Sequence, residues 1–563
     1  MILILLNWLY ILFTTLNFGC FLNKIFGLKV KSFVVTSILG LFFTTIFASI
    51  WAIFGRINIE FHIAILLLNV FLFRFYKPDI LSLYRDFSNK IKILDNWLKI
   101  FLPLTTFFII AQCATVPYIL DNESYYIQSI KWINEFGFVK GLANLHIFMG
   151  QTSGWHITQS AFNFSFLYDK FNDLSGFCLL LGNVFAIEKL NDYFKDQNKI
   201  KLIVGLFPTA NILLFQFISA PSPDLPIYVL TFVIFAIFLE NYNKINAESF
   251  NLISILVLFC LYIKPTSIAL CSVPIFLLIQ NFKRIYLSKI FTLSALVLVL
   301  FVAKNLIVTG YALFPMTNDF GFATDYQIPQ KVADLYYKLT KYFAYSLSET
   351  QYNEMSIFEI FMQWFSMPRL HGLFNKLSLF LVVFTPIVYL KFFNLRKFWV
   401  LYLVMFIQLL LLFMSSPQYR FFMNFILFFS FMWMAIFLTK RKQIMALLTV
   451  STLVTAFVLF IPLNLKHLAR NEVAVLTSHF SIRHFIFPYQ NSKYEVDFER
   501  IENDHFYYNS PKNIDFFWGT ANGEIPCVNQ TQIDYFEKNY HVKPQMRSDD
   551  LKDGFYAKDT SNE

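Results

Sequence analysis

The chain has 563 residues, of which 57% are hydrophobic and only 15% are charged. A water-soluble protein of this length needs a more highly charged surface, so the excess apolar side chains are expected to face a lipid bilayer. The net charge of +10 could suit nucleic acid, but Lys and Arg gather in short loops between apolar stretches, as in membrane proteins. The composition therefore predicts an all-α polytopic membrane protein that contacts the bilayer and binds no nucleic acid.

About fourteen apolar stretches approach the length of about 20 residues that a helix needs to cross a bilayer. The first begins at Ile2 without a basic region or a cleavage site, so we expect a retained span, not a signal peptide. The stretch 250–281 is interpreted as two short spans that meet at Lys264-Pro265, because one span would place the later basic clusters outside. The predicted spans are 2–22, 33–54, 60–76, 100–119, 174–188, 202–219, 225–240, 250–263, 266–281, 290–308, 374–390, 398–414, 419–438 and 443–463.

Alternate loops are basic, which predicts that they are cytoplasmic. Three long segments, 120–173, 310–373 and 464–563, then lie on the other side, together with the short loop "SAPSPD". We predict accessory helices in 1–99, a core in 100–463 and a small extracytoplasmic domain in 464–563. The bias toward Asn, Lys, Ile and Phe suits an AT-rich bacterial genome and hence an inner membrane. The basic loops contain Lys24, Lys29 and Lys31; Lys77, Arg85, Lys90, Lys92 and Lys99; Lys189, Lys195, Lys199 and Lys201; Lys283, Arg284 and Lys289; Lys391, Arg396 and Lys397; and Lys440, Arg441 and Lys442.

The stretch "LDNESYY", residues 120–126, opens the first long external segment with two carboxylates, Asp121 and Glu123. Apolar residues recur at helical spacing after it, as at Ile127 and Ile130, so this segment is expected to lie on the membrane surface. Either carboxylate could cap a helix by accepting bonds from free backbone N–H groups. A partly desolvated carboxylate could instead act as a general base for a hydroxyl group. Both interpretations stay open.

The order of these features resembles the GT-C superfamily of integral membrane glycosyltransferases. The shared features are an apolar helix that ends in "DNESYY", a long external loop, a second acidic loop in "SAPSPDLPIY", further spans and an external tail. The resemblance covers about residues 100–463 and implies a GT-C-like core. It also implies that Asp121, with Glu123 as a substitute, is the catalytic base or binds the acceptor. The donor it implies is a sugar on a polyprenyl phosphate.

Two parts of the chain depart from that pattern. The three spans before Ile100 are additional, and the tail does not resemble a characterised GT-C external domain. The tail segments "DFFWGTANGEIPC" and "RSDDLKDGFY" resemble an uncharacterised group of bacterial multi-spanning proteins, which implies no activity.

Cations near the predicted outer ends are candidate ligands for the donor phosphate. Lys304 lies inside a span and Arg420 follows "SSPQY", and an ionisable group in a span is costly enough to indicate function. The structural alternative is a long side chain that reaches the headgroups. Because Arg suits bidentate phosphate contacts, Arg420 is the preferred ligand, with Lys304, Lys264 and Arg369 as alternates.

Asp224, His146 and His156 are candidates for binding the acceptor or a metal. Asp224 lies in a Pro-rich turn in which Asp is an ordinary residue, but hard cations do take oxygen ligands from separate loops. The two histidines lack the spacing of a helical zinc pair, and interfacial structural roles are the alternative. No cofactor is required by the sequence, and a divalent cation stays an open expectation.

These features together predict an inverting glycosyltransferase of the cell envelope. It would transfer a sugar from a lipid-linked donor to a glycan, lipid or protein acceptor on the extracytoplasmic face. A transporter or lipid flippase is the first alternative, but it would carry charges near mid-span and often shows repeats. An O-antigen polymerase or ligase, which Arg420, Arg369 and His371 would suit, and a noncatalytic assembly subunit are the others.

Overall fold

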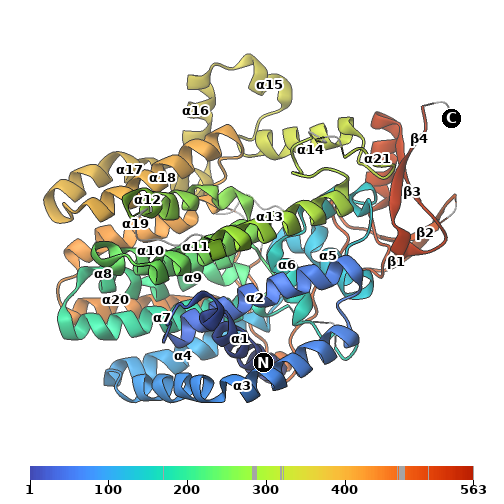
Figure 1. Cartoon of the computed structure of the whole chain (residues 1–563). Coiled ribbons are helices and arrows are strands. Elements are labelled where there is room, and N and C mark those ends of the chain that lie inside the picture. The colour runs from blue at the N-terminus through green and yellow to red at the C-terminus, as the bar shows by residue number, and fades with distance from the viewer. Residues whose placement is uncertain are drawn as a thin grey trace.

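A computed structural model describes residues 1–168, 170, 172–281, 288–317, 320, 322–465, 467, 476–504 and 506–561. Every predicted apolar stretch contains a helix, and most of these helices run side by side in one bundle (Figure 1). Among the described residues, 11 helical stretches are long and apolar enough to cross a membrane, and three further apolar helices are shorter. The chain is therefore a predominantly helical, multi-pass membrane protein.

All but one of the long stretches are single helices, of which α3 (Ile59–Lys92) is kinked. The exception, 199–217, is broken near Pro208, where the missing N–H interrupts helical hydrogen bonding. It consists of α8 (Lys199–Gly205), η4 (Phe207–Ala210), α9 (Asn211–Leu214) and η5 (Phe215–Phe217). The single helices are α1 (Ile2–Phe26), α2 (Phe33–Phe54), α3 (Ile59–Lys92), α4 (Asn96–Cys113), α7 (Leu174–Asp196), α10 (Asp224–Asn241), α13 (Ser288–Thr309), α17 (Arg369–Phe392), α18 (Arg396–Met414) and α20 (Arg441–Phe460).

The predicted break at Lys264-Pro265 is confirmed. The short helix α11 (Ala247–Ile263) ends just before Lys264, whose extended backbone (φ −151°, ψ 103°) is typical of a residue that precedes proline. Two consecutive helical segments, η7 (Pro265–Cys271) and α12 (Ser272–Asn281), follow. The basic residues Lys283 and Arg284 lie outside the described part of the chain.

The basic segment 77–99, which was expected to be a loop, is mostly helical. The helix α3 kinks at Tyr76 (φ −109°, ψ 15°), close to Pro78, and then continues to its end. Ile80 in its second half is buried against Leu16 of α1. The sequence prediction was wrong here because the lysines are interspersed with apolar residues, and these apolar residues form a helical face that packs against α1.

The segments beyond the bundle share an apolar core of their own. It joins the segment 120–173, which the sequence predicts to be the first external segment, with residues 308–336 and the tail (464–563). Ile127 and Ile130 are buried, and Trp132 packs edge-on against Phe555 at 5.7 Å. The apolar face that was expected to meet the membrane surface is therefore buried within the protein, partly against the tail and partly, at Ile133, against the bundle. The helices between α4 and α7 are η1 (Asn122–Tyr126), α5 (Ile127–Phe136), η2 (Leu142–Asn144), η3 (Ile147–Gln151) and α6 (Gly154–Ala161), of which α6 packs in the core of the bundle. Those between α13 and α17 are α14 (Gln330–Phe343), α15 (Glu349–Glu354) and α16 (Ile357–Phe365).

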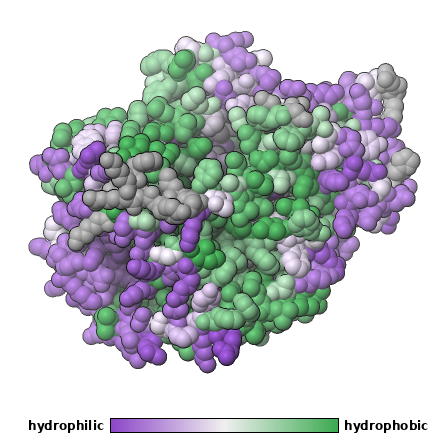
Figure 2. Space-filling view, in the orientation of Figure 1, coloured by the Kyte–Doolittle hydropathy of each residue, from purple (hydrophilic) through white to green (hydrophobic). Residues whose placement is uncertain are grey.

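The tail forms two small antiparallel sheets beside one end of the bundle (Figure 1). In the first, β1 (Phe498–Asn503) pairs with β2 (Phe506–Pro511); in the second, β3 (Val542–Met546) pairs with β4 (Phe555–Asp559). The helix α21 (Gln530–Tyr540) lies between the sheets in sequence. Figure 2 shows a broad hydrophobic region across the helices, with hydrophilic surface at the tail and at the opposite end. This distribution fits a bundle that crosses a bilayer.

The remaining segments are one helix of the bundle, α19 (Met423–Phe437), and short helical turns. These turns are η6 (Tyr242–Lys244), η9 (Tyr419–Phe421), η10 (Ile482–His484) and η11 (Leu551–Asp553), of which η10 and η11 lie in the tail.

Candidate ionic site

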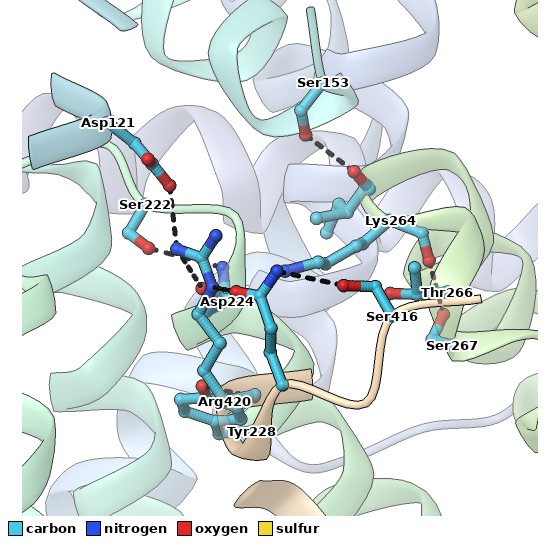
Figure 3. Close-up of polar contacts among 12 residues, drawn as sticks. Asp121, Ser153, Ser222, Asp224, Tyr228, Lys264, Thr266, Ser267, Ser416 and Arg420 are labelled. Atoms are coloured by element: carbon cyan, nitrogen blue, oxygen red, sulfur yellow. Dashed lines mark hydrogen bonds and ion pairs between the residues drawn. The ribbon is translucent and has the colours of Figure 1, made fainter. Parts of the chain in front are cut away.

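Four ionisable residues that are far apart in sequence meet where helices end (Figure 3). Arg420 Nη1 lies 2.7 Å from Asp121 Oδ2 and 4.0 Å from Asp224 Oδ2. The ammonium group of Lys264 is paired with Asp224 Oδ1. We call Asp121, Asp224, Lys264 and Arg420 the ionic network.

Breaks in the helices place each member of the network. Asp121 lies in the connection between α4 and η1, and Asp224 is the first residue of α10, where the helix dipole favours a negative charge. Lys264 lies in the break between α11 and η7, and Arg420 lies in η9 just before α19. The network is thus formed from four different connections of the bundle.

The network has an exposed half and a buried half. The side chains of Asp121 and Arg420 are 31% and 30% exposed, whereas that of Asp224 is 3% exposed. Lys264 Nζ also lies 3.9 Å from the centre of the Phe421 ring, which favours a cation. The Asp121–Arg420 pair is therefore the part that a ligand can reach, and Asp224–Lys264 is its support.

A helix-capping role for Asp121 is not observed. Asp121 precedes η1, but its side chain accepts no capping hydrogen bond; the Tyr126 hydroxyl donates to its carboxylate at 3.5 Å. Its strongest contact is the ion pair with Arg420. The structure therefore does not support the capping interpretation of Asp121, and its role as a general base stays a prediction.

Glu123 lies outside the network. Its buried carboxylate accepts hydrogen bonds from the Ser492 hydroxyl, the Lys493 N–H and the Asn122 side chain. Burial raises the pKa of Glu123, and these donors oppose that shift. The carboxylate therefore holds the tail against the first external segment, and its position does not support the expected substitution for Asp121.

Lys304 and His156 lie beside the ionic network and are not members of it. The buried Lys304 ammonium donates to the Thr152 carbonyl at 2.5 Å, and no carboxylate among the described residues forms an ion pair with it. Burial lowers the pKa of His156 to about 3, the charge of Lys304 adds to the shift and that of Asp121 opposes it. His156 is thus neutral at physiological pH and lies within the electrostatic reach of both charges.

Two further candidates are not part of the network. His146 Nδ1 accepts from the Phe148 N–H, its Nε2 contacts the Trp518 carbonyl at 3.3 Å, and burial lowers its pKa to about 4. This histidine therefore has a structural position beneath the tail. Arg369 is exposed at the start of α17, and two residues later the His371 ring packs edge-on against the Tyr419 ring at 5.0 Å.

The expected metal site does not fit this arrangement. Within the described ranges, no group of three His, Cys, Asp or Glu side chains is placed to hold a metal ion. Asp121 and Asp224 both face cations, so their oxygens are already compensated.

Three residues around Arg420 were not anticipated from the sequence. The Tyr228 hydroxyl donates to the Arg420 carbonyl at 2.7 Å, and Arg420 Nε donates to Gln418 Oε1 at 2.9 Å. Phe421 lies beneath both cations of the network. Tyr228 follows Asp224 by four residues, so helical spacing could have placed the two on one face of α10.

Replacing Asp224 with asparagine is expected to lower the free energy of unfolding by about 3–5 kcal/mol, because Lys264 loses its buried counter-ion. The double variant Asp224→Asn/Lys264→Met removes both charges and should recover most of that loss. Thermal unfolding in one detergent would measure both. Asp196→Asn breaks an exposed pair with Lys201 and should cost less than about 1 kcal/mol. An additive loss in the double variant would contradict the pairing.

The chain belongs to a family whose model is described as a domain of unknown function, DUF8201, which matches residues 1–427. The match begins in α1 and includes all four members of the ionic network, whereas the tail lies beyond it. No curated protein and no solved structure matches the chain. The network therefore lies within the part of the chain that the family model covers.

Proposed function

We propose that this protein is a membrane glycosyltransferase with a GT-C-like core, which transfers a sugar from a polyprenyl-phosphate donor to an acceptor in cell-envelope glycan assembly. The observation that carries the proposal is the ionic network, which sets an accessible carboxylate 2.7 Å from an accessible guanidinium. A transferase of this kind needs a base for the acceptor hydroxyl and a cation for the leaving phosphate. The resemblance of the acidic motifs to GT-C enzymes supports the same reaction.

In the proposed orientation, the fourteen apolar helical stretches all cross the bilayer and the basic loops are cytoplasmic. The network, the external segments and the tail then lie on the extracytoplasmic face of a bacterial inner membrane. A phosphate carried by a membrane lipid is presented at the depth of Arg420, where the helices end. The site would therefore receive its donor from the bilayer and its acceptor from the aqueous side.

The charges of the region suit an anionic donor. Asp121 and Asp224 balance Arg420 and Lys264, and the nearby Lys304 adds a cation that no described carboxylate pairs. A donor phosphate would bind Arg420 and compete with Asp121 for it. Since the guanidinium can form several hydrogen bonds, phosphate binding would release Asp121 for the acceptor.

The proposed reaction is a direct displacement. The acceptor oxygen attacks the anomeric carbon, the bond from that carbon to the phosphate oxygen breaks, and the acceptor proton passes to Asp121. The polyprenyl phosphate leaves with the bonding electrons, and Arg420 stabilises its charge. This path inverts the anomeric centre.

Asp121→Asn is expected to abolish transfer while leaving the fold intact, because asparagine keeps the shape of the side chain but accepts no proton. The measurement is the glycan and lipid-linked sugar profile of cells that contain equal amounts of either protein in the membrane. Asp79→Asn, which removes an exposed pair with Lys24, is the matched control and should leave the profile unchanged. Accumulated lipid-linked sugar and a glycan that lacks one residue would support the proposal. A profile like that of the wild type would contradict it and favour a transporter or assembly subunit.

A further inference from the structure

An apolar groove lies between α1 and α4, away from the ionic network. Its volume is about 1,030 Å³. Its walls include Leu5 of α1, Ile91 of α3, and Leu102, Phe107 and Ile110 of α4. These three helices form one side of the bundle in Figure 1. The groove therefore opens along the surface that the bilayer would cover.

On the side of α1 away from the groove, α1 packs closely on α2, whereas it makes few contacts with α4. A Cβ atom on Gly19 would lie 1.9 Å from the Thr36 carbonyl oxygen, and one on Gly40 would lie 1.8 Å from the Thr15 carbonyl oxygen. Such close approach at small residues is typical of tightly packed membrane helices. This close packing holds α1 against α2. The space between α1 and α4 stays open to another molecule.

One end of the groove is cationic. Lys92 and Lys99 line it, both are exposed, and no carboxylate in the described part of the chain forms an ion pair with either. The other end is closed by Phe485 and Met1, whose α-amino group already donates to the His484 carbonyl at 2.9 Å. The positive charge available to a ligand is therefore confined to the end with the two lysines.

The dimensions match a lipid of one leaflet. At 1.5 Å per helical residue, the wall of α4 from Lys99 to Ile110 is about 16 Å long. One leaflet supplies about half of a hydrocarbon core of about 30 Å. An acyl chain that lies along α4 would thus place its headgroup at the level of Lys99.

We propose that this groove binds an anionic phospholipid, with its acyl chains along α1 and α4 and its phosphate between Lys92 and Lys99. The apolar walls supply affinity for any lipid chain, and the unpaired lysines select a negative headgroup. The bound lipid fills the gap between the two helices and stabilises the position of α1, whose first residue, Ile2, donates its N–H to the Phe485 carbonyl of the tail at 3.0 Å. This site is independent of the proposed transferase reaction.

The test uses the whole protein in nanodiscs of phosphatidylcholine with increasing fractions of phosphatidylglycerol. Crosslinking to a photoactivatable phosphatidylglycerol, mapped by mass spectrometry, is expected at α1 and α4. Lys92→Gln/Lys99→Gln should weaken the preference for phosphatidylglycerol over phosphatidylcholine roughly tenfold, since each lysine contributes to anionic-lipid binding. Lys29→Gln/Lys31→Gln, in another basic loop with exposed lysines, is the matched control and should retain the preference.

A second variant tests the groove without changing its charge. Thr106→Trp places a large side chain within the lining and should reduce crosslinking at α1 and α4 while both lysines remain. Equal crosslinking by the two lipids, or an equal loss in both lysine variants, would overturn the proposal. Crosslinks between two copies of the chain at this groove, in place of lipid, would overturn it as well.

Discussion

Replacing Arg420 with alanine is expected to lower sugar transfer by about 100- to 1,000-fold, the usual effect of removing one group that stabilises developing charge. In the proposed reaction, Arg420 binds the leaving phosphate and its loss also leaves Asp121 without its partner at 2.7 Å. Arg420→Lys keeps the charge but not the planar fork, so one ammonium cannot contact a phosphate and a carboxylate in the same way. We expect intermediate transfer from that variant. Transfer would be measured in membrane vesicles, together with the lipid-linked sugar that accumulates in cells.

The matched control for Arg420 is Arg441, which is paired with Asp95 at the opposite end of the bundle and has a 50% exposed side chain. Arg441→Ala removes an equal charge and should leave transfer unchanged. Unfolding temperatures of both variants should lie close to that of the wild type, because both side chains have some exposure to solvent. Normal transfer by Arg420→Ala, at equal abundance in the membrane, would remove Arg420 from the mechanism.

The sequence could predict most of the bundle helices because a helix that crosses a bilayer needs about 20 apolar residues and because proline interrupts a helix. The division of 250–281 into two spans followed from the positions of the later basic loops, and the structure shows extended backbone at the predicted meeting point, Lys264-Pro265. The second half of α3 could not be predicted in this way. Its lysines indicate a loop, whereas the burial of Ile80 depends on its packing against α1.

The site was predictable only in outline. The alternation of basic and non-basic loops predicts that Asp121, Asp224 and Arg420 lie on one side of the membrane. The partners of each residue, however, depend on how the helices pack. The ion pair between Asp121 and Arg420 joins residues that are 299 positions apart, and no local pattern encodes such a contact. The divergence of Asp121 from Glu123 could have been anticipated, since residues two apart in a helix point in different directions.

The tail was expected to be a separate small domain, and no sequence pattern indicated what it would contact. In the structure, the N–H groups of Thr520 and Ala521 donate to the Glu123 carbonyl at 2.8 and 3.1 Å. The Gln128 side chain donates to the Gly523 carbonyl at 2.9 Å. These bonds connect the tail to the residues that directly follow Asp121, so the tail helps to hold the ionic network in place.

Glu123→Ala is expected to release the tail from the first external segment. The change leaves the Ser492 hydroxyl and the Lys493 N–H without their buried acceptor, at a cost of about 1–3 kcal/mol for each unsatisfied group. Cys527 reports the release, because its thiol is buried and contacts the Thr520 carbonyl at 3.3 Å. In a protein whose other cysteines are replaced by alanine, a membrane-impermeant maleimide should label Cys527 faster in Glu123→Ala than in the parent.

The control for Glu123 is Glu499, which lies in the tail and forms an exposed pair with Lys512. Glu499→Ala should leave the labelling rate unchanged, since its carboxylate contributes little to docking. Glu123→Gln keeps one acceptor oxygen and should label at an intermediate rate. If release of the tail also lowers sugar transfer, the tail positions Asp121 through the residues that follow it. Equal labelling rates in Glu123→Ala and Glu499→Ala would show that other contacts hold the tail, and Glu123 would then be only one of several buried polar groups at this interface.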